Sequence, residues 1–268
     1  MSADDVNRRW TRSMPEAYER HLVPALFRPF AADLAARAAA LRPRTVLELA
    51  AGTGVLTSAL LAAAPEASVV ATDLNDAMVA TGAVREPRAR WRQADAQELP
   101  FPDGGFDLVV CQFGVMFFPD RRAAFAEVRR VLAPHGRFLF SSWGPLDSHG
   151  FDAAFQGALD DSMPEGAPQF LREVPHGYTD PTVVAAELAA AGLVLATAEE
   201  VTLHGEAESV ESVAVGFLTG TPVSAAVQDR ADAQALRAAV SRRITERLGA
   251  GRVTAPMTAT VYTAHHRT

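Results

Sequence analysis

The sequence predicts an α/β fold built on a doubly wound, mostly parallel sheet of seven strands. Short apolar segments of strand length alternate with amphipathic segments of helical length, which is typical of such a sheet. The predicted strands are apolar on both faces, as expected for strands covered by helices on each side. The first three of them also end in an acidic residue: Glu48, Asp73 and Asp95.

The strands and helices are delimited by turn residues and helix caps. Seven segments are predicted to be strands: residues 45–49, 68–72, 90–94, 106–111, 137–142, 193–203 and 255–265. Asn75 or Asp76 can cap the helix that carries Met78, and Asp180 followed by Pro181 begins another helix. A proline near the start of the last strand predicts a place near the sheet edge.

Composition excludes several classes of function. The chain has a net charge of -7, and such acidity disfavours a nucleic-acid partner because it repels phosphate. The sequence contains no lysine, which excludes Schiff-base and phosphate-loop lysine chemistry. One cysteine, Cys111, excludes a disulfide framework and fits a reducing compartment. With no apolar run near the ~18 residues of a membrane span and an acidic, polar N-terminus, we expect a cytoplasmic protein.

The turn after the first strand is the most informative motif. The strand ends in Glu48, small residues follow through Gly52 and Gly54, and a helix begins. Small residues let the backbone approach a ligand closely, and the helix start offers free N–H groups. A dinucleotide fingerprint needs a third glycine, but that position holds Thr57. The carboxylate before the turn opposes a pyrophosphate and suits a ligand that carries an amino group.

The next two strand ends add two further acids. Asp73 follows Gly54 by nineteen residues, where a carboxylate can accept hydrogen bonds from two ribose hydroxyls. Asp95 and Ala96 follow the third strand, where they can meet an adenine edge. Either aspartate could instead serve a cap or a turn.

Four motifs in this order resemble those of the class I S-adenosylmethionine-dependent methyltransferases, in the broad group of the ubiquinone and menaquinone biosynthesis enzymes. The matching segments are residues 48–54, 72–74, 94–101 and 127–136. The resemblance implies a Rossmann-like fold and methyl transfer from S-adenosyl-L-methionine, with S-adenosyl-L-homocysteine as the product. It implies no metal ion. One departure is Ala50, which stands where the family usually has its first glycine, and we expect its small methyl group to be tolerated.

The resemblance also assigns cofactor-binding roles to single residues. Glu48 would lie near the methionine amino group, Asp73 would hold the ribose, and Asp95 would accept from the adenine amine. The other cofactor-binding residues implied are Ala50, Gly52, Thr53, Gly54, Leu74, Met78, Ala96 and Gln112. We read the chain as a single domain, 1–268, in four parts: a helical lid (1–42), a cofactor-binding half (43–144), a cap insertion (145–178) and a C-terminal half with further cap helices (179–268). The proline-broken, non-periodic insertion is predicted to be irregular, with few regular hydrogen bonds.

The sequence leaves the acceptor and the catalytic residues open. His149, just beyond the fifth strand, could act as a general base, and His21 and Tyr18 lie on the N-terminal segment. These three residues could equally be packing residues without a catalytic role. Phe151, Phe155, Met163 and Phe170 in the insertion suggest a small apolar or aromatic acceptor, methylated on oxygen, nitrogen or carbon. The alternatives are a cofactor-binding member repurposed as a cyclase or rearrangement enzyme, and a non-catalytic partner protein.

Overall fold

The computed structural model describes residues 14–227 and 230–267, which divide into two compact units. Of the described residues, the first unit contains those from 14 to 29, Trp143–Gly177 and Thr202–Thr258. The second contains Phe30–Ser142, Tyr178–Val201 and Ala259–Thr268. The predicted 1–42 segment therefore contributes to both units, and its residues 1–13 lie outside the described part.

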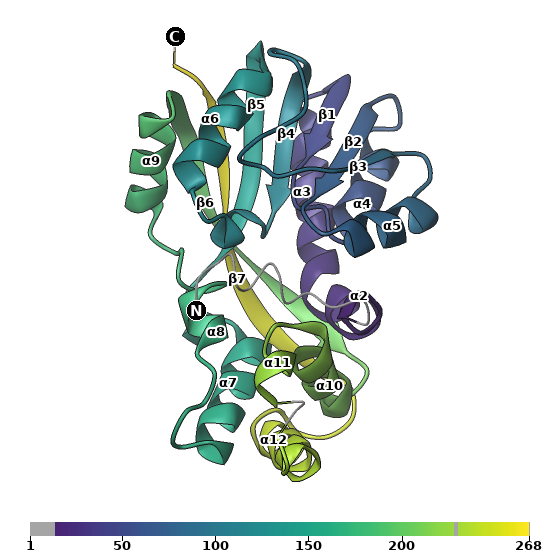
Figure 1. Cartoon of the computed structure of the whole chain (residues 1–268), viewed down its shortest axis with the longest axis vertical. Coiled ribbons are helices and arrows are strands. Elements are labelled where there is room, and N and C mark those ends of the chain that lie inside the picture. Colours follow the sequence, from purple (N-terminus) through teal and green to yellow (C-terminus); the bar gives the residue numbers. More distant parts are fainter. Residues whose placement is uncertain (1–13, 228–229, 268) are drawn as a thin grey trace. The chain divides into compact units, whose positions relative to one another are not determined.

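The described residues form a seven-stranded sheet, which confirms the predicted fold class (Figure 1). Its strand order is β3-β2-β1-β4-β5-β7-β6, and the pairs from β3 to β5 are parallel. The strands are β1 (Thr45–Glu48), β2 (Ser68–Asp73), β3 (Arg90–Gln93), β4 (Phe106–Gln112), β5 (Leu132–Trp143), β6 (Leu193–Ala207) and β7 (Val253–His266). Because β1, β2 and β3 are parallel neighbours, their carboxyl ends lie at one edge, as the three strand-end acids predicted.

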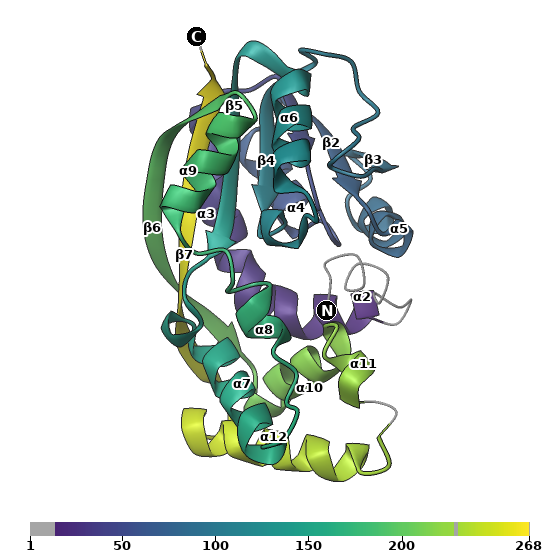
Figure 2. The ribbon, with the colours of Figure 1, turned by 60° about the vertical axis from the view of Figure 1, so that its left-hand side comes forward.

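Helices of the second unit cover both faces of this sheet (Figure 2). The helices α3 (Arg28–Ala40) and α4 (Val55–Ala63) pack against alternate strand residues such as Val46 and Leu108. On the opposite face, Phe125 of α6 (Arg121–Val131) contacts Phe138 and Phe140 of β5. The helix α9 (Pro181–Ala190) lies beside α6, to which it is joined by an ion pair between Arg121 and Glu187. Successive side chains of a strand therefore pack against helices on opposite faces of the sheet, which explains why the strands are apolar throughout.

The predicted caps are found at the start of two helices. The Asn75 side chain accepts hydrogen bonds from the backbone N–H groups of Ala77 and Met78, so Asn75 rather than Asp76 caps α5 (Asp76–Arg85). The Asp180 side chain accepts from Thr182 N and caps α9.

The last strand lies near the sheet edge, as the proline near its start predicted. β7 is between β5 and β6, and β6 is the edge strand on that side of the described sheet. Pro256 lies in residues 253–258 of β7, which belong to the first unit, whereas residues 259–266 run through the second. Pro256 therefore removes a backbone N–H donor only near the beginning of a long strand.

The first unit is mainly helical. It contains α2 (Met14–Ala17), the π-helix η1 (Tyr18–Phe27), α7 (Gly150–Ser162), α8 (Phe170–Glu173), α10 (Val210–Gly220), α11 (Ser224–Val227) and α12 (Ala233–Leu248). The 145–178 insertion was predicted to be irregular, and this is wrong for α7, a helix of 13 residues. Phe151, Phe155 and Leu159 recur every four residues and are fully buried, so one apolar face fixes this helix.

No helix in the described ranges is long and apolar enough to cross a membrane.

Candidate functional site

The turn between β1 and α4 has an unusual backbone. Ala50, Gly52 and Gly54 all have positive φ angles, of 51°, 56° and 93°. Around Gly52, a Cβ atom placed on the backbone would meet nothing within 4 Å, so the space in front of this residue is open. Side chains at such angles cost about 1–2 kcal/mol, which explains why small residues occupy the turn. Buried Thr53 completes it.

Ala50 accepts a conformation that suits glycine better, and its methyl group has a defined neighbour. A Cβ atom on Gly114, in the segment after β4, would lie 2.5 Å from the Ala50 Cβ and 2.7 Å from the Cys111 Sγ. Gly114 therefore leaves the room that the Ala50 methyl group occupies.

Glu48 is a buried acid at the end of β1. Its side chain is 1% exposed, and its Oε2 accepts a hydrogen bond of 2.6 Å from Thr57 Oγ1. Burial raises the pKa of Glu48 to about 8, because removal from water disfavours the charged form more than the Thr57 hydroxyl favours it. Sequence reasoning used Thr57 only as a missing glycine, whereas the structure shows it orienting this carboxyl group.

Asp73, at the end of β2, faces the same turn. Its Oδ2 accepts from Gly52 N at 2.8 Å and its Oδ1 accepts from Asn75 N at 2.9 Å. Burial raises the pKa of Asp73, and these backbone N–H groups oppose that effect. A carboxylate has about four lone-pair sites, so Asp73 can accept a further donor beside the N–H groups of Gly52, Asn75 and Leu74. The Asp73 carboxylate thus connects the turn after β1 with the segment that begins α5. Asp73 remains partly exposed.

The segment after β3 is held by side chains of its own. Both Asp95 carboxylate oxygens accept from Gln97 Nε2 at 3.2 Å, and Oδ1 also accepts from Gln97 N at 2.8 Å. Asp95 is therefore part of a turn in this structure, beside partly exposed Ala96. The strand itself ends at Gln93, two residues before Asp95.

Two residues of α6 fasten the end of that segment. Glu127 Oε2 accepts from Leu99 N at 2.7 Å, while Arg130 donates to the carbonyl oxygens of Leu99 and Phe101 at 2.8 and 2.7 Å. Sequence reasoning placed Glu127 and Arg130 in a motif without a role. Their role depends on a contact across 28 or more residues, which the sequence does not display.

The remaining predicted cofactor residues differ in exposure. Leu74 is 46% exposed at the start of the loop after β2, whereas Met78 is 4% exposed on α5. Gln112 is the last residue of β4 and lies in register with Ser141 of β5. Phe113 follows it with a φ of 53°, an uncommon angle for a bulky side chain, and packs edge-on against Phe30.

The three candidate catalytic residues all lie in the first unit. Tyr18 and His149 belong to one series of ring contacts: Tyr18 to Phe27 at 5.0 Å, Phe27 to Trp143 at 5.9 Å and Trp143 to His149 at 4.6 Å. His21 lies elsewhere, with its Nδ1 2.8 Å from Ser212 Oγ of α10. Burial lowers the pKa of His21.

His149 lies in a buried cluster that the sequence did not predict. Its Nδ1 contacts Asp152 Oδ2, and His176 Nε2 lies 3.4 Å from Asp152 Oδ1. All three side chains are buried. Burial alone would raise the pKa of Asp152, but the two imidazoles hold that pKa below its usual range. Only the i, i+3 spacing of His149 and Asp152 at a helix start could have indicated this pair.

The aromatic residues of the insertion are core residues. Phe151, Phe155, Met163 and Phe170 are all at most 8% exposed, and Phe155 stacks on Phe217 at 4.6 Å. They therefore stabilise the first unit and do not by themselves describe an acceptor site.

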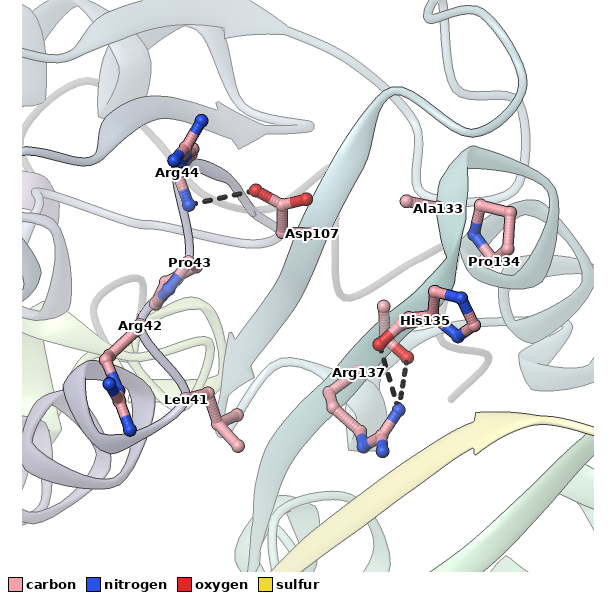
Figure 3. A pocket seen from close by; sticks show the side chains of 10 residues that line it. Leu41, Arg42, Pro43, Arg44, Asp107, Ala133, Pro134, His135 and Arg137 are labelled. Atoms are coloured by element: carbon pink, nitrogen blue, oxygen red, sulfur yellow. Dashed lines mark hydrogen bonds between the residues drawn. The ribbon is translucent and has the colours of Figure 1, made fainter.

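The second unit also has a pocket, which is lined by none of the predicted site residues. Figure 3 shows the side chains around it. Its lining comes from Leu41–Arg44, Asp107 and residues 133–137, at the amino ends of β1, β4 and β5. Ligands of open α/β sheets bind at the carboxyl ends, so we do not assign this pocket to the reaction.

Comparisons with known proteins agree with this geometry. Residues 47–140 match the family model described as a methyltransferase domain. Over 175 residues the chain is 35% identical to a demethylmenaquinone methyltransferase of Thermus thermophilus, covering 60% of this chain and 78% of the relative. It is 38% identical over 154 residues to a malonyl-[acyl-carrier protein] O-methyltransferase of Halorhodospira halophila, covering 55% and 52%.

Solved structures share the fold at low sequence identity. The crystal structure of the [4+2]-cyclase SpnF is similar with a TM-score of 0.63 and 15% identity, covering 99% of this chain and 97% of that one. This likeness concerns the fold alone, whereas the family is established by the sequence relatives and the matching methyltransferase domain: the chain belongs to the class I S-adenosylmethionine-dependent methyltransferases related to the ubiquinone and menaquinone biosynthesis enzymes.

Proposed function

We propose that the chain binds S-adenosylmethionine at the carboxyl ends of β1 and β2 and in the loop after β3. The observation that carries this proposal is the pair of acids Glu48 and Asp73 at the ends of the neighbouring strands β1 and β2, with Asp73 bonded to Gly52, in front of which the space is open. An ammonium group suits the buried Glu48 carboxylate, and a ligand hydroxyl group suits the remaining acceptor capacity of the Asp73 carboxylate. The residues present thus fit the amino acid and ribose parts of this cofactor.

The chain's own residues would position the cofactor rather than react with it. Thr57 holds the Glu48 carboxyl group in one orientation, and the positive φ angles of the turn keep its backbone clear of the ligand. Glu127 and Arg130 hold the loop that carries Asp95 and Ala96. S-adenosylmethionine supplies a methyl group already activated on a sulfonium. Alignment of donor and acceptor can contribute about 7–11 kcal/mol to such a transfer.

For the acceptor, we propose a small apolar or aromatic metabolite. The support is the sequence relative named for demethylmenaquinone, of which the chain covers 78% at 35% identity. The atom that receives the methyl group is left open in this proposal, because another relative is named as an O-methyltransferase. The role of His149 as a base stays a prediction of the sequence, and the proposed acceptor does not depend on it.

A second candidate function is cyclisation or rearrangement of a bound small molecule. The likeness to the SpnF structure, a [4+2]-cyclase, covers 99% of this chain, so it includes residues of both units. Likeness of fold is compatible with either reaction. The two differ in one product, since only methyl transfer converts S-adenosylmethionine to S-adenosylhomocysteine.

The first experiment measures binding by calorimetry with the full chain, using S-adenosylhomocysteine and NAD. We expect binding of the former alone. Asp73→Ala removes a charged acceptor worth about 1.5–3 kcal/mol per hydrogen bond, so affinity should fall roughly tenfold or more. Glu66→Ala, at an exposed carboxylate just before β2, is the control. NAD binding without a response to S-adenosylhomocysteine would refute the cofactor proposal.

The second experiment identifies the reaction. The protein is incubated with methyl-labelled S-adenosylmethionine and a panel of naphthohydroquinones, phenols and malonyl thioesters. We expect S-adenosylhomocysteine and a labelled aromatic product. Turnover of a panel member without S-adenosylhomocysteine would favour the cyclase candidate, and labelling of the malonyl thioester alone would reject the aromatic acceptor.

A further inference from the structure

The buried cluster of His149, Asp152 and His176 lies within the first unit and has no part in the proposed cofactor site. Their exposed fractions are 1%, 3% and 7%. His149 precedes α7 and Asp152 lies in its first turn, while His176 follows α8. The three side chains therefore converge from two segments, and each offers one potential ligand atom within 4.8 Å of the others.

The hydrogen bond of His176 to the backbone fixes which of its nitrogens carries a proton. His176 Nδ1 lies 2.7 Å from the carbonyl oxygen of Gly144, and a carbonyl oxygen only accepts, so Nδ1 is the donor. A neutral His176 ring then presents the Nε2 lone pair to the Asp152 carboxylate. Two acceptors facing one another in a buried place require a positive species between them.

The Gly144 carbonyl oxygen is itself held in place. Gly144 N donates to Thr258 O of β7 at 2.8 Å, and a Cβ on Gly144 would approach that same oxygen to 3.0 Å. Histidines that bind metals typically donate their other ring N–H to a backbone carbonyl or a carboxylate, which orients the ring. The His176 contact with Gly144 is of this kind.

The separation of the two facing atoms fits a metal site better than a hydrogen bond. His176 Nε2 lies 3.4 Å from Asp152 Oδ1. A charge-assisted hydrogen bond is shorter, about 2.7–2.9 Å. Two ligands of a tetrahedral ion with bonds of about 2.0–2.1 Å are separated by about 3.3–3.4 Å. Within the described residues, His176 Nε2 and His149 Nε2 have no hydrogen-bond partner.

We propose that His149, Asp152 and His176 bind one divalent transition-metal ion. Two imidazoles and one carboxylate suit Zn²⁺ or Fe²⁺, whereas Mg²⁺ and Ca²⁺ prefer oxygen ligands throughout. Three protein ligands leave a fourth position for water or another small ligand. The close contact of His149 Nδ1 with Asp152 Oδ2 is then the ion-free form, in which a proton takes the place of the metal.

The site would connect parts of the chain that are distant in sequence. His149 and Asp152 fix the start of α7, and His176 fixes the segment after α8, 24 residues further along than Asp152. An ion at this place would stabilise the folded first unit by binding the native form preferentially. This inference does not depend on the proposed cofactor or acceptor.

The test uses the full chain without a histidine tag, stripped of metal by a chelator that is then removed. Zn²⁺ alone is titrated in competition with a chromophoric chelator, and Co²⁺ is added separately to obtain the absorption spectrum of its coordination sphere. We expect one ion per chain and a tetrahedral Co²⁺ spectrum. The variants Asp152→Asn, His149→Gln and His176→Gln should each weaken Zn²⁺ binding at least about tenfold.

His135→Gln is the matched control, because His135 is an exposed histidine of the second unit. It should leave the Zn²⁺ affinity unchanged. A measurement on the unchanged chain avoids dependence on variants that fail to fold: Zn²⁺ should shift the ring NMR signals of His149 and His176 and leave those of exposed His135 and His204 in place. Absence of binding, equal binding in the cluster variants, or shifts confined to the exposed histidines would overturn the proposal and identify the cluster as a proton-linked ion network.

Discussion

At the scale of single residues, the two acids of the candidate site are prepared in different ways. Glu48 is withdrawn from water and relies on one hydroxyl donor, whereas Asp73 is partly exposed and receives backbone N–H groups. The pKa of about 8 for Glu48 means that this group is largely protonated at neutral pH without ligand. Binding of a cation beside it must therefore release a proton.

This release predicts a pH-dependent cofactor affinity. Below pH 8 the folded, ligand-free Glu48 holds its proton, so the affinity for S-adenosylhomocysteine should increase with pH. If one proton is released per ligand bound, the affinity should increase roughly tenfold between pH 6 and 7 and by less near pH 8. Calorimetry at several pH values measures this slope. Glu48→Gln should bind more weakly at pH 7.5 and show a flat profile; an equally steep profile in that variant would assign the proton to another group.

At the scale of elements, contacts between neighbouring segments decide what a residue contributes. Gly82 lies inside α5, where alanine would ordinarily be the better helix former. A Cβ atom there would meet the Trp91 ring at 2.2–2.7 Å. Trp91 is held by its indole N–H, which donates to Glu86 O at 3.0 Å, so the ring cannot move away freely.

Gly82→Ala should therefore destabilise the protein despite the better helix propensity. Overpacking of this kind costs about 1–3 kcal/mol. Chemical denaturation measures the free energy of unfolding. Val84→Ala is the control on the same helix, because Val84 is 84% exposed and the substitution improves helix propensity. A Gly82→Ala variant as stable as Val84→Ala would show that the indole is not fixed.

The hydrogen bonds from α6 to the loop after β3 give a second prediction at this scale. Arg130→Gln removes the donors to Leu99 O and Phe101 O and the ion pair with Glu127. We expect S-adenosylhomocysteine affinity to fall several-fold, because the loop that carries Asp95 and Ala96 loses its support. The exposed Arg122 on the same helix provides the control variant Arg122→Gln. Equal affinity in the two variants, measured by calorimetry, would show that the loop needs no such support.

At the scale of the whole molecule, ligand binding should appear as added stability. A ligand at 100 times its dissociation constant adds about 2.7 kcal/mol to the free energy of unfolding. For a protein of this size that corresponds to roughly 5–10 °C in Tm. Thermal unfolding with and without S-adenosylhomocysteine should show this increase, and Asp73→Ala at the same ligand concentration should show much less. A Tm that does not change at saturation would contradict binding to the folded state.

The sequence by itself determined the order of the seven strands along the chain, the cap at Asp180, and the acids at the ends of β1 and β2, while it left the cap of α5 open between Asn75 and Asp76. These features depend on residues close together in the chain, through strand apolarity, cap chemistry and glycine turns. The family motifs between residues 48 and 136 are likewise local, so their order was enough to indicate the family.

Only the tertiary structure decided the contacts between distant segments. The place of β7 between β5 and β6, the helix α7 within a segment expected to be irregular, and the pairing of His176 with Asp152 all depend on packing. Packing also gave Thr57, Glu127 and Arg130 their partners. The physical reason is that burial and hydrogen bonding across the fold override local preference, and a sequence pattern does not record which distant side chains meet.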